Sequence, residues 1–374
     1  MSTLQVVVDQ LAAPSPGPLG RYAADLTRAV VAAAPAGWDV RGIVSATSSG
    51  DQRRIRSQLP GLAGLSATTL PRRELMAAWP LGMGGVGGML HAPGLLAPLR
   101  RHEAGGGDQV VVTVHDSAAW DDPQSVGTVT AAWRKSTLKR ARKHADAIIA
   151  PSHAMAERLL DFGIGVERIR VIGTAPRAGL ELPSDQHARR RDLGLPRDGY
   201  AVVTGGPAAR AGLAEAFTAL VRPEASGLGL VVVGPPVWDD RSVEDAAAEH
   251  GLPRSLVRVL AEPEPADLAS VLAGAVAHLD PSPAWGDATA TIEALSLGVP
   301  VVHTDTPVLL ETTAGAALVV ERDRALPDRI ASALARLASD DGLREQLAIA
   351  GSDRARMFTW QDVGERVWQL HADL

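Results

Sequence analysis

One carboxylate, Glu293, stands where the sequence predicts a ligand site. A turn-rich run from Asp280 to Asp287 leads into a predicted helix over residues 288–297, which stops at Gly298. The backbone N–H groups and the dipole at the start of such a helix can hold an anion such as a diphosphate. Glu293 could then accept hydrogen bonds from sugar hydroxyls. Because an unpaired carboxylate in an apolar helix is costly, a structural cap or ion pair is the alternative role for Glu293.

His115 and Asp116 form a second candidate site, at the end of a predicted buried strand over residues 110–114. In α/β proteins, side chains at the carboxyl ends of strands often contact ligands. The pair is therefore a candidate for catalytic contact with a donor sugar or an acceptor, and the alternative for His115 is a structural hydrogen bond. No second His or carboxylate with metal-ligand spacing lies nearby, so we expect no metal.

The composition is that of a soluble globular chain long enough for two domains. Its 374 residues are 46% hydrophobic and 21% charged, with no Cys. The first 30 residues lack a basic segment followed by an apolar one, and no apolar run approaches a membrane span. We therefore expect a cytoplasmic protein. Residues 1–180 carry a net charge of +6 and residues 181–374 one of −12, which supports two domains with different partners.

Predicted strands and helices alternate along the chain, stop at a linker over residues 173–184, and then start again. This alternation predicts two doubly wound α/β domains with parallel sheets, whose carboxyl ends face a cleft. The predicted strands are 4–8, 40–45, 110–114, 147–150, 169–172, 201–204, 228–233, 258–260, 275–279, 299–303 and 318–320. The predicted helices are 21–34, 131–144, 153–162, 212–220, 243–250, 266–273, 288–297, 325–338, 342–357 and 360–371.

Four blocks occur in a fixed order along the chain. They are P-L-G-R-Y-A-A-D-L (18–26), V-V-V-T-V-H-D (110–116), A-D-A-I-I-A-P-S-H-A-M-A-E-R-L-L (145–160) with E-R-I-R-V-I-G (167–173), and I-E-A-L-S-L-G-V-P-V-V-H-T-D-T-P-V-L-L-E (292–311). With the tail M-F-T-W-Q-D-V-G-E-R-V (357–367), these blocks resemble the retaining glycosyltransferases of the family-4 type (glycosyl transferases group 1), which have the GT-B fold.

The resemblance implies two Rossmann-like domains. Residues 1–176 would form an acceptor-side domain, residues 184–357 would bind the nucleotide-sugar, and the closing helix 358–374 would pack back on the first domain. It also implies transfer of a sugar from a GDP- or UDP-linked donor to a saccharide or lipid-linked acceptor, with retention and without a metal or other cofactor. Gly20 and Arg21 would lie beside the donor diphosphate, although Gly20 could equally be only a turn residue.

The chain departs from the family pattern in the donor block. Trp285 stands where the family has its first Glu, and W-G-D-A-T-A (285–290) replaces E-G-F-G-L-P. Trp285 and Gly286 remain candidate donor contacts; the alternative is that Trp285 only fills the space of the lost Glu.

A second departure concerns the phosphate-binding turn. G-G-P-A-A-R-A-G (205–212) has Ala211 at the Lys position and Gly206 at the first Arg position, so only Arg210 remains basic. Arg210 is either a surviving phosphate contact or a surface residue at a helix start. The losses make a catalytically impaired homologue that serves as a sugar-binding or partner-binding scaffold the alternative function.

The remaining candidates concern partners. The predicted basic helix 131–144 is either a solvated face or a peripheral contact with an anionic membrane at its inner face. No aromatic-rich basic module indicates nucleic-acid binding. The one G-x-G-x-x-G of the sequence, at residues 82–87, follows no predicted strand, and G-x-x-x-x-G-K-[ST] does not occur, which argues against a dehydrogenase or another nucleotide-using enzyme. Glu311 is expected to fix a helix start, with ligand contact as the alternative.

Overall fold

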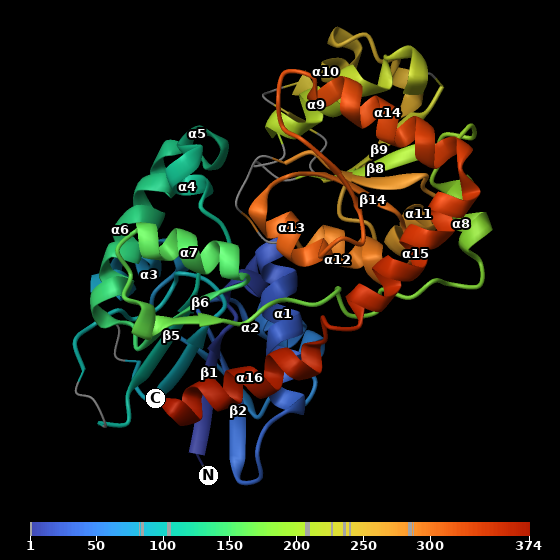
Figure 1. Ribbon diagram of the computed structural model, residues 1–374. Coiled ribbons are helices and arrows are strands. Elements are labelled where there is room, and N and C mark those ends of the chain that lie inside the picture. Colours follow the sequence, from blue (N-terminus) through green and yellow to red (C-terminus); the bar gives the residue numbers. More distant parts are fainter. Residues whose placement is uncertain are drawn as a thin grey trace. The chain divides into compact units, whose positions relative to one another are not determined.

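The computed structural model describes most of the chain (Figure 1). The described residues are 2–81, 83, 86–102, 106–205, 210–225, 227–234, 237–238, 241–282, 286 and 288–374; of residues 210, 211, 237, 238 and 241 only the backbone is described. They divide into two compact units. Unit 1 comprises Met1–Trp120, Gly127–Ala175 and Thr359–Leu374, and unit 2 comprises Asp121–Val126 and Pro176–Phe358.

Unit 1 contains a seven-stranded parallel sheet with the order β3-β2-β1-β4-β5-β6-β7. The strands are short and rich in β-branched residues, as buried parallel strands are. They are β1 (Ser2–Val7), β2 (Trp38–Val44), β3 (Gly64–Ala67), β4 (Met89–Ala92), β5 (Gln109–Thr113), β6 (Ala147–Ala150) and β7 (Ile169–Val171). The helices between residues 17 and 161 are α1 (Gly17–Ala32), α2 (Ser49–Gln58), α3 (Arg72–Ala78), α4 (Ala118–Asp121), α5 (Pro123–Val126), α6 (Thr128–His144) and α7 (His153–Asp161).

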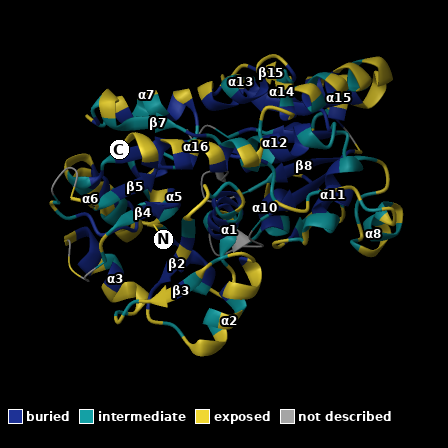
Figure 2. Ribbon diagram, turned by 90° about the horizontal axis from the view of Figure 1, so that it is seen from below, coloured by how far each residue is buried: buried dark blue, intermediate teal, exposed yellow. Residues whose placement is uncertain are grey.

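Unit 2 contains a six-stranded parallel sheet with the order β12-β9-β8-β13-β14-β15. Figure 2 shows β8 as buried, whereas the surface helix α2 of unit 1 carries many exposed positions. The strands of unit 2 are β8 (Tyr200–Thr204), β9 (Gly229–Val233), β12 (Val257–Leu260), β13 (Ala277–Asp280), β14 (Val301–Thr304) and β15 (Leu318–Val320), with a small hairpin of β10 (Val237–Trp238) and β11 (Arg241–Ser242). Besides α5, its helices are α8 (Gln186–Asp192), α9 (Arg210–Leu220), α10 (Val243–Glu249), α11 (Pro265–Ala273), α12 (Thr289–Ser296), α13 (Pro307–Thr313), α14 (Leu326–Ser339) and α15 (Asp341–Ala355).

The two parallel α/β sheets confirm the predicted fold class. Most predicted elements occur within two or three residues of their expected ends, and Ser152 caps α7 by accepting from the Met155 N–H at 3.1 Å. The helix predicted over residues 21–34 begins earlier than expected: α1 already starts at Gly17, because prolines are tolerated in the first turn of a helix. The elements that the sequence did not predict are short: α2, β3, α3, β4, α4, α5, α8, β10, β11 and α13. None of the described helices is both long and apolar enough to span a membrane.

The last helix, α16 (Trp360–Asp373), belongs to unit 1, where it packs against α1. The indole of Trp368 donates to the Val30 carbonyl at 2.8 Å. A Cβ added at Gly364 would lie 2.5 Å from the Ala29 carbonyl oxygen, so the close approach of the two helices requires glycine there.

A buried histidine pair connects α16 to the sheet of unit 1. His371 Nε2 lies 3.3 Å from His91 Nδ1 on β4, and His371 Nδ1 lies 3.0 Å from Gln109 Oε1. Burial lowers the pKa of His91 well below its usual value and lowers that of His371 to about 4, although Asp146 opposes the shift of His371. Both side chains are therefore neutral at pH 7.

This pair predicts a loss of stability in mild acid. Below pH 6.5 the unfolded chain protonates both histidines while the folded protein does not, so the free energy of unfolding falls from pH 6.5 towards pH 4. His371→Gln should reduce the slope by up to about 1.4 kcal/mol per pH unit, measured by urea unfolding between pH 7 and 5. Gln361→Ala, at an exposed position of α16 that does not titrate, is the control and should leave the slope unchanged. Equal slopes for His371→Gln and the wild type would contradict the assignment.

Candidate functional site

The strand order of unit 2 reverses between β8 and β13, and such a switch point opens a crevice at the carboxyl ends of the two strands. β8 ends at Thr204 and leads towards α9, whereas β13 ends at Asp280 and leads into α12. The start of α9 contacts the connection that follows β13, since a Cβ added at Gly212 would lie 3.0 Å from both the carbonyl carbon and the oxygen of Pro281. The switch point therefore places the first residue after β13 beside the start of α9.

Hydrogen bonds fix the first residues after β13. Asp280 Oδ1 accepts from the Ser282 N–H at 3.2 Å, and Oδ2 accepts from the Thr291 hydroxyl on α12 at 3.2 Å. The hydroxyls of Thr304 and Thr306 both donate to the Ser282 carbonyl, at 2.9 and 3.0 Å. These threonines were missed at the sequence level. The one feature that could have indicated them is their position, at the carboxyl end of β14 and just beyond it.

Glu293 lies in α12 and is almost fully buried, with 2% of its side chain exposed. Its carboxylate faces Arg177: Arg177 Nε donates to Oε1 at 2.6 Å, Nη2 donates to Oε2 at 2.9 Å, and the Arg177 backbone N–H lies 3.3 Å from Oε1. The ion-pair role, one of the two considered for Glu293, is thus present in the structure. Sequence reasoning missed Arg177. The expected contact of Glu293 with sugar hydroxyls stays a prediction.

His115 and Asp116 follow β5, at the carboxyl edge of the sheet of unit 1. His115 Nε2 lies 2.7 Å from the Pro93 carbonyl oxygen, and its ring meets that of Tyr22 edge-on with 4.5 Å between centroids. Asp116 accepts from Arg134 Nη1 at 3.0 and 3.1 Å and from the Ala118 N–H at 2.9 Å. Both side chains are half-buried and already engaged, so the structural role of His115 is present and ligand contact stays a prediction.

Gly20 and Arg21 lie within the first two turns of α1, the α-helix that follows the carboxyl end of β1 in the chain. A Cβ added at Gly20 would clash with the Cβ of Pro16, so the residue must be glycine for the entry into α1. Arg21 is half-buried. Their expected role beside a diphosphate stays a prediction.

Two of the further candidates lie wholly or partly outside the described residues. Trp285 is outside them, and of Arg210 only the backbone is described, as the first residue of α9. Gly286 is described and half-buried. Glu311 lies in the second half of α13, so its expected role at a helix start was wrong.

Two buried histidines lie close to Asp280. His278 is two residues before it on β13, and His303 is its register partner on β14. Burial lowers the pKa of both, with Asp280 opposing the shift. Both are therefore neutral at pH 7. Neither ring nitrogen of His278 has a hydrogen-bond partner among the described residues, and these residues contain no group of His, Asp and Glu arranged to hold a metal ion.

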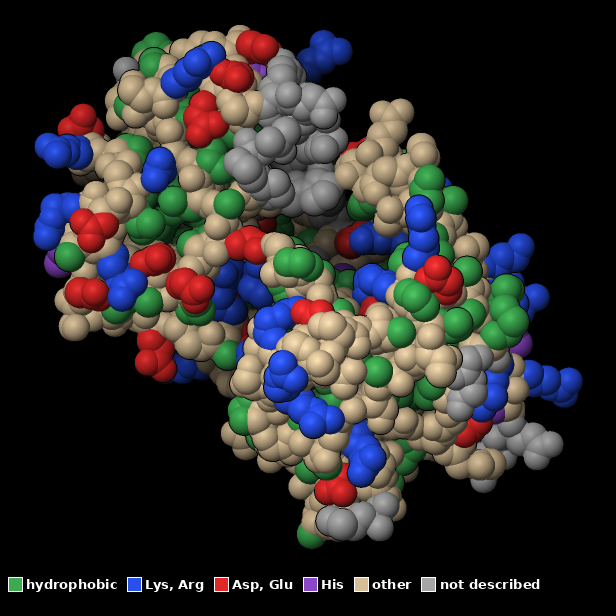
Figure 3. All heavy atoms as spheres, turned by 180° about the vertical axis from the view of Figure 1, so that it is seen from behind, with side chains coloured by type: hydrophobic (Ala, Val, Ile, Leu, Met, Phe, Trp, Pro, Cys, Tyr) green, Lys and Arg blue, Asp and Glu red, His purple; other side chains and the backbone are tan. Residues whose placement is uncertain are grey.

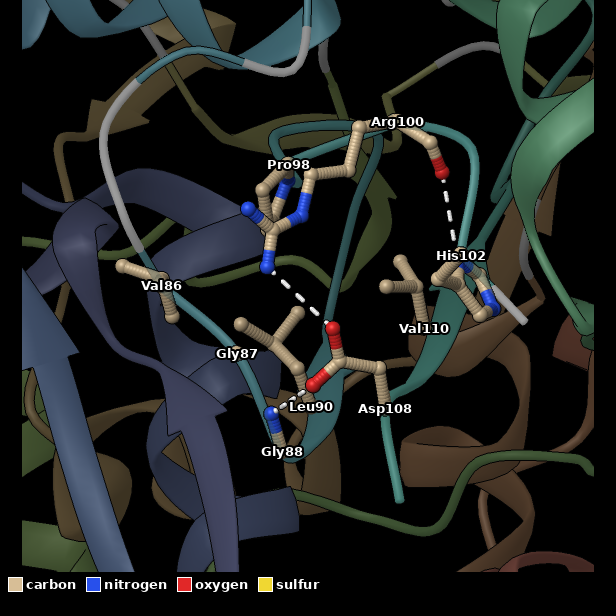
Figure 4. A pocket seen from close by; sticks show the side chains of 9 residues that line it. All are labelled: Val86, Gly87, Gly88, Leu90, Pro98, Arg100, His102, Asp108 and Val110. Carbon is tan, nitrogen blue, oxygen red and sulfur yellow. Dashed lines mark hydrogen bonds and ion pairs between the residues drawn. The ribbon is translucent and has the colours of Figure 1, made fainter. Parts of the chain in front are cut away.

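Unit 1 contains a small cavity near the edge of its sheet where the strands begin (Figure 4). Asp108 there pairs with Arg100 at 3.2 Å and accepts from the Gly88 N–H at 2.6 Å. The cavity holds about 10 Å³, the space of one water molecule, and adjoins the amino ends of β4 and β5. Its size and place argue against a role in substrate binding.

Comparison with known proteins assigns the chain. The model of Glycosyltransferase Family 4 matches residues 19–175, and that of Glycosyl transferases group 1 matches residues 209–340. The chain is 28% identical over 243 residues to D-inositol 3-phosphate glycosyltransferase from Acidothermus cellulolyticus, covering 61% of this chain and 53% of that protein. It is 26% identical over 283 residues to O-antigen chain mannosyltransferase B from Escherichia coli, covering 73% and 71%. The chain thus spans about half the length of the first relative.

Solved structures show the same fold. Sucrose-phosphate synthase from Thermosynechococcus elongatus has a TM-score of 0.74 at 20% identity, with 100% of this chain and 99% of that chain covered. Anabaena Alr3699/HepE in complex with UDP and glucose has a TM-score of 0.70 at 15% identity, with both chains fully covered. With family models matched in both units and this fold, the chain belongs to the GT-B glycosyltransferases of family 4 and group 1.

Proposed function

We propose that this chain transfers a sugar from a UDP- or GDP-linked donor to a saccharide or lipid-linked acceptor, with retention at the anomeric carbon and without a metal. The observation that carries the proposal is the switch point of unit 2, where the connection from β13 to α12 contacts the start of α9. Backbone N–H groups in the first turn of a helix suit a diphosphate. The known complexes of Anabaena Alr3699/HepE with UDP-glucose support a nucleotide-sugar as the donor.

The chemistry needs two things from unit 2. The leaving diphosphate must meet donors aimed at its developing charge, and the oxocarbenium-like sugar must be held close to the acceptor hydroxyl. The amides of α12 and the cation Arg210 would serve the first need in unit 2. Gly20 and Arg21 are the candidate diphosphate residues of unit 1. Gly286 and Trp285 would border the sugar, and His115 and Asp116 would contact the sugar or the acceptor.

The second candidate function is a catalytically impaired homologue that binds a sugar or a partner as a scaffold. Specific sequence positions favour it: Ala211 and Gly206 replace the cations of the phosphate-binding turn, and Trp285 replaces a carboxylate. Removing one donor aimed at developing charge commonly costs roughly 100- to 1,000-fold in rate. Slow transfer or donor hydrolysis is therefore expected even if the donor binds.

Donor binding and catalysis can be separated by calorimetry and product analysis. We expect the wild type to bind at least one of a panel of UDP- and GDP-sugars and to hydrolyse it slowly. Ala211→Lys, which restores a cation that the family has, should raise that rate by roughly 100- to 1,000-fold. The prediction rests on the sequence pattern alone.

The control is Ala214→Lys, one turn further along α9, which should leave the rate unchanged. Binding without any turnover in either protein would favour the scaffold function, whereas a folded sample that binds no nucleotide-sugar would contradict both.

We also propose that α6 brings unit 1 to an anionic membrane surface on the cytoplasmic side, where a lipid-linked acceptor resides. Lys and Arg predominate over unit 1 on the face drawn in Figure 3, whereas acidic side chains are frequent over unit 2. Four cations of α6 are exposed at positions 135, 139, 142 and 143, which share one helix face. Within the described part of the chain none of the four pairs with a carboxylate. By contrast, Arg134 is bound to Asp116 and Arg140 to the Leu99 carbonyl.

Vesicle sedimentation tests this role of α6. Replacing Lys135, Lys139 and Lys143 with Ser should weaken binding to vesicles containing anionic phosphatidylglycerol by roughly 100-fold, at about 1 kcal/mol per charge. The control replaces three exposed arginines elsewhere with Ser, which changes the net charge equally: Arg53, Arg73 and Arg324. Equal losses in the two triple variants would show that only net charge matters and would contradict a role of α6.

A further inference from the structure

Arg322 is a cation at the carboxyl edge of the sheet of unit 2, two residues beyond the end of β15. Its Nη1 donates to the carbonyl of Pro281, the first residue after β13, at 3.0 Å. Its backbone N–H donates to Oδ1 of Asp305, the first residue after β14, at 3.1 Å. Because β14 lies between β13 and β15, the side chain reaches past the end of β14 to the connection that leads from β13 to α12.

The Pro281 carbonyl connects this cation to two elements of the proposed donor site. A Cβ added at Gly212, in the first turn of α9, would lie 3.0 Å from the same carbonyl oxygen. The residue before Pro281, Asp280, accepts at 3.2 Å from the hydroxyl of Thr291 in the first turn of α12. The guanidinium of Arg322 thus contacts an atom that borders the start of α9, and the next residue along the chain binds the first turn of α12.

Most of the hydrogen-bonding capacity of Arg322 is unused within the described part of the chain. A guanidinium has five N–H donors, and the bond to Pro281 uses one of them. Glu215 Oε1 on α9 lies 4.0 Å from Nη2, which is too far for a hydrogen bond. The edge of the guanidinium formed by Nε and Nη2 therefore keeps its donors, and 31% of the side chain is exposed.

Glu215 is the charged neighbour that an anion at Arg322 would meet. Its Oε2 is buried and has no hydrogen-bond partner among the described residues, and Arg322 is too distant to supply one. A carboxylate here repels a bound anion, whereas the guanidinium attracts it. Removing the charge of Glu215 and removing the charge of Arg322 should therefore have opposite effects on an anion bound at this edge.

We propose that Arg322 binds the diphosphate of the nucleotide-sugar, as a cation contributed by the end of β15. Nη1 stays on the Pro281 carbonyl and fixes the plane of the guanidinium. Nε and Nη2 donate two parallel hydrogen bonds to phosphate oxygens, the geometry in which arginine binds phosphate. This inference rests on the proposed function. It places a cation outside the phosphate-binding turn, where Ala211 and Gly206 leave Arg210 as the one basic residue.

The test compares UDP with uridine, and GDP with guanosine, on the full chain, by calorimetry for the diphosphates and NMR titration for the nucleosides. Arg322→Gln should weaken binding of the diphosphate roughly 10- to 100-fold, as expected for hydrogen bonds between charged groups. It should leave the affinity for the nucleoside unchanged, because a nucleoside carries no phosphate. The ratio of the two affinities therefore reports the contact with the diphosphate.

The double variant Ala211→Lys/Arg322→Gln separates charge from structure. Position 211 precedes Gly212 in the first turn of α9, so a lysine there returns a cation near the Pro281 carbonyl without returning the hydrogen bond of Arg322 to it. The double variant should bind the diphosphate roughly 10-fold more tightly than Arg322→Gln.

Arg329→Gln is the matched control, since Arg329 lies on α14 of the same unit, pairs with Asp323 at 2.7 Å and changes the net charge equally. It should leave the affinity ratio as in the wild type. Glu215→Gln provides a second measurement that leaves Arg322 in place. Once circular dichroism shows that it is folded, it should bind the diphosphate roughly 2- to 5-fold more tightly, the size of a partly exposed charge interaction.

Two results would overturn the inference while leaving the proposed function intact. One is an affinity ratio in Arg322→Gln equal to that of the wild type, or a loss that the lysine at position 211 does not recover, since Arg322 would then only hold the Pro281 carbonyl. The other is unchanged or weaker binding of the diphosphate by folded Glu215→Gln. Absence of any UDP or GDP binding to the folded wild type would refute the proposed function and this inference together.

Discussion

A parallel sheet places the carboxyl ends of all its strands at the same edge. In both units this constraint determines where side chains that follow different strands can meet. In unit 2 the order reverses between β8 and β13, so the connections that follow these two strands diverge at that edge. Three hydrogen-bonding side chains of this unit lie at the same edge. Asp280 ties β13 to α12, and Thr304 and Thr306 hold the Ser282 carbonyl from β14 and its following turn.

The sequence predicted the fold well because its signals were local. Apolar runs of four to six residues gave the central strands, and Gly298, which takes a left-handed backbone with φ of 67°, marked the end of α12 as expected. The elements that were missed are short and have weak patterns. The helix α2, for example, buries only Ile55 among its ten residues, so it has almost no apolar periodicity to detect.

The site could be predicted only in part, because its contacts join residues far apart in the chain. The sequence showed that a carboxylate at Glu293 needs a partner, but nothing local pointed to Arg177, 116 positions away. The same holds for Asp116. Its partner Arg134 is one of several basic residues in the predicted helix 131–144, and nothing in the sequence distinguishes it from the others. A long-range pair leaves no mark on the spacing of residues, so composition and periodicity cannot reveal it.

Residues that maintain the fold and residues that would contact a ligand are under different physical constraints. Gly212 against Pro281 and Gly20 against Pro16 are positions where close contact leaves no room for a Cβ, so any larger side chain would require the chain to shift. A side chain that contacts only a ligand meets no such constraint from the fold. A buried Arg177–Glu293 pair is different from both, since it costs desolvation wherever it stands and is retained only with all its hydrogen bonds in place. Its geometry therefore fixes the orientation of both side chains at the start of unit 2 and on α12.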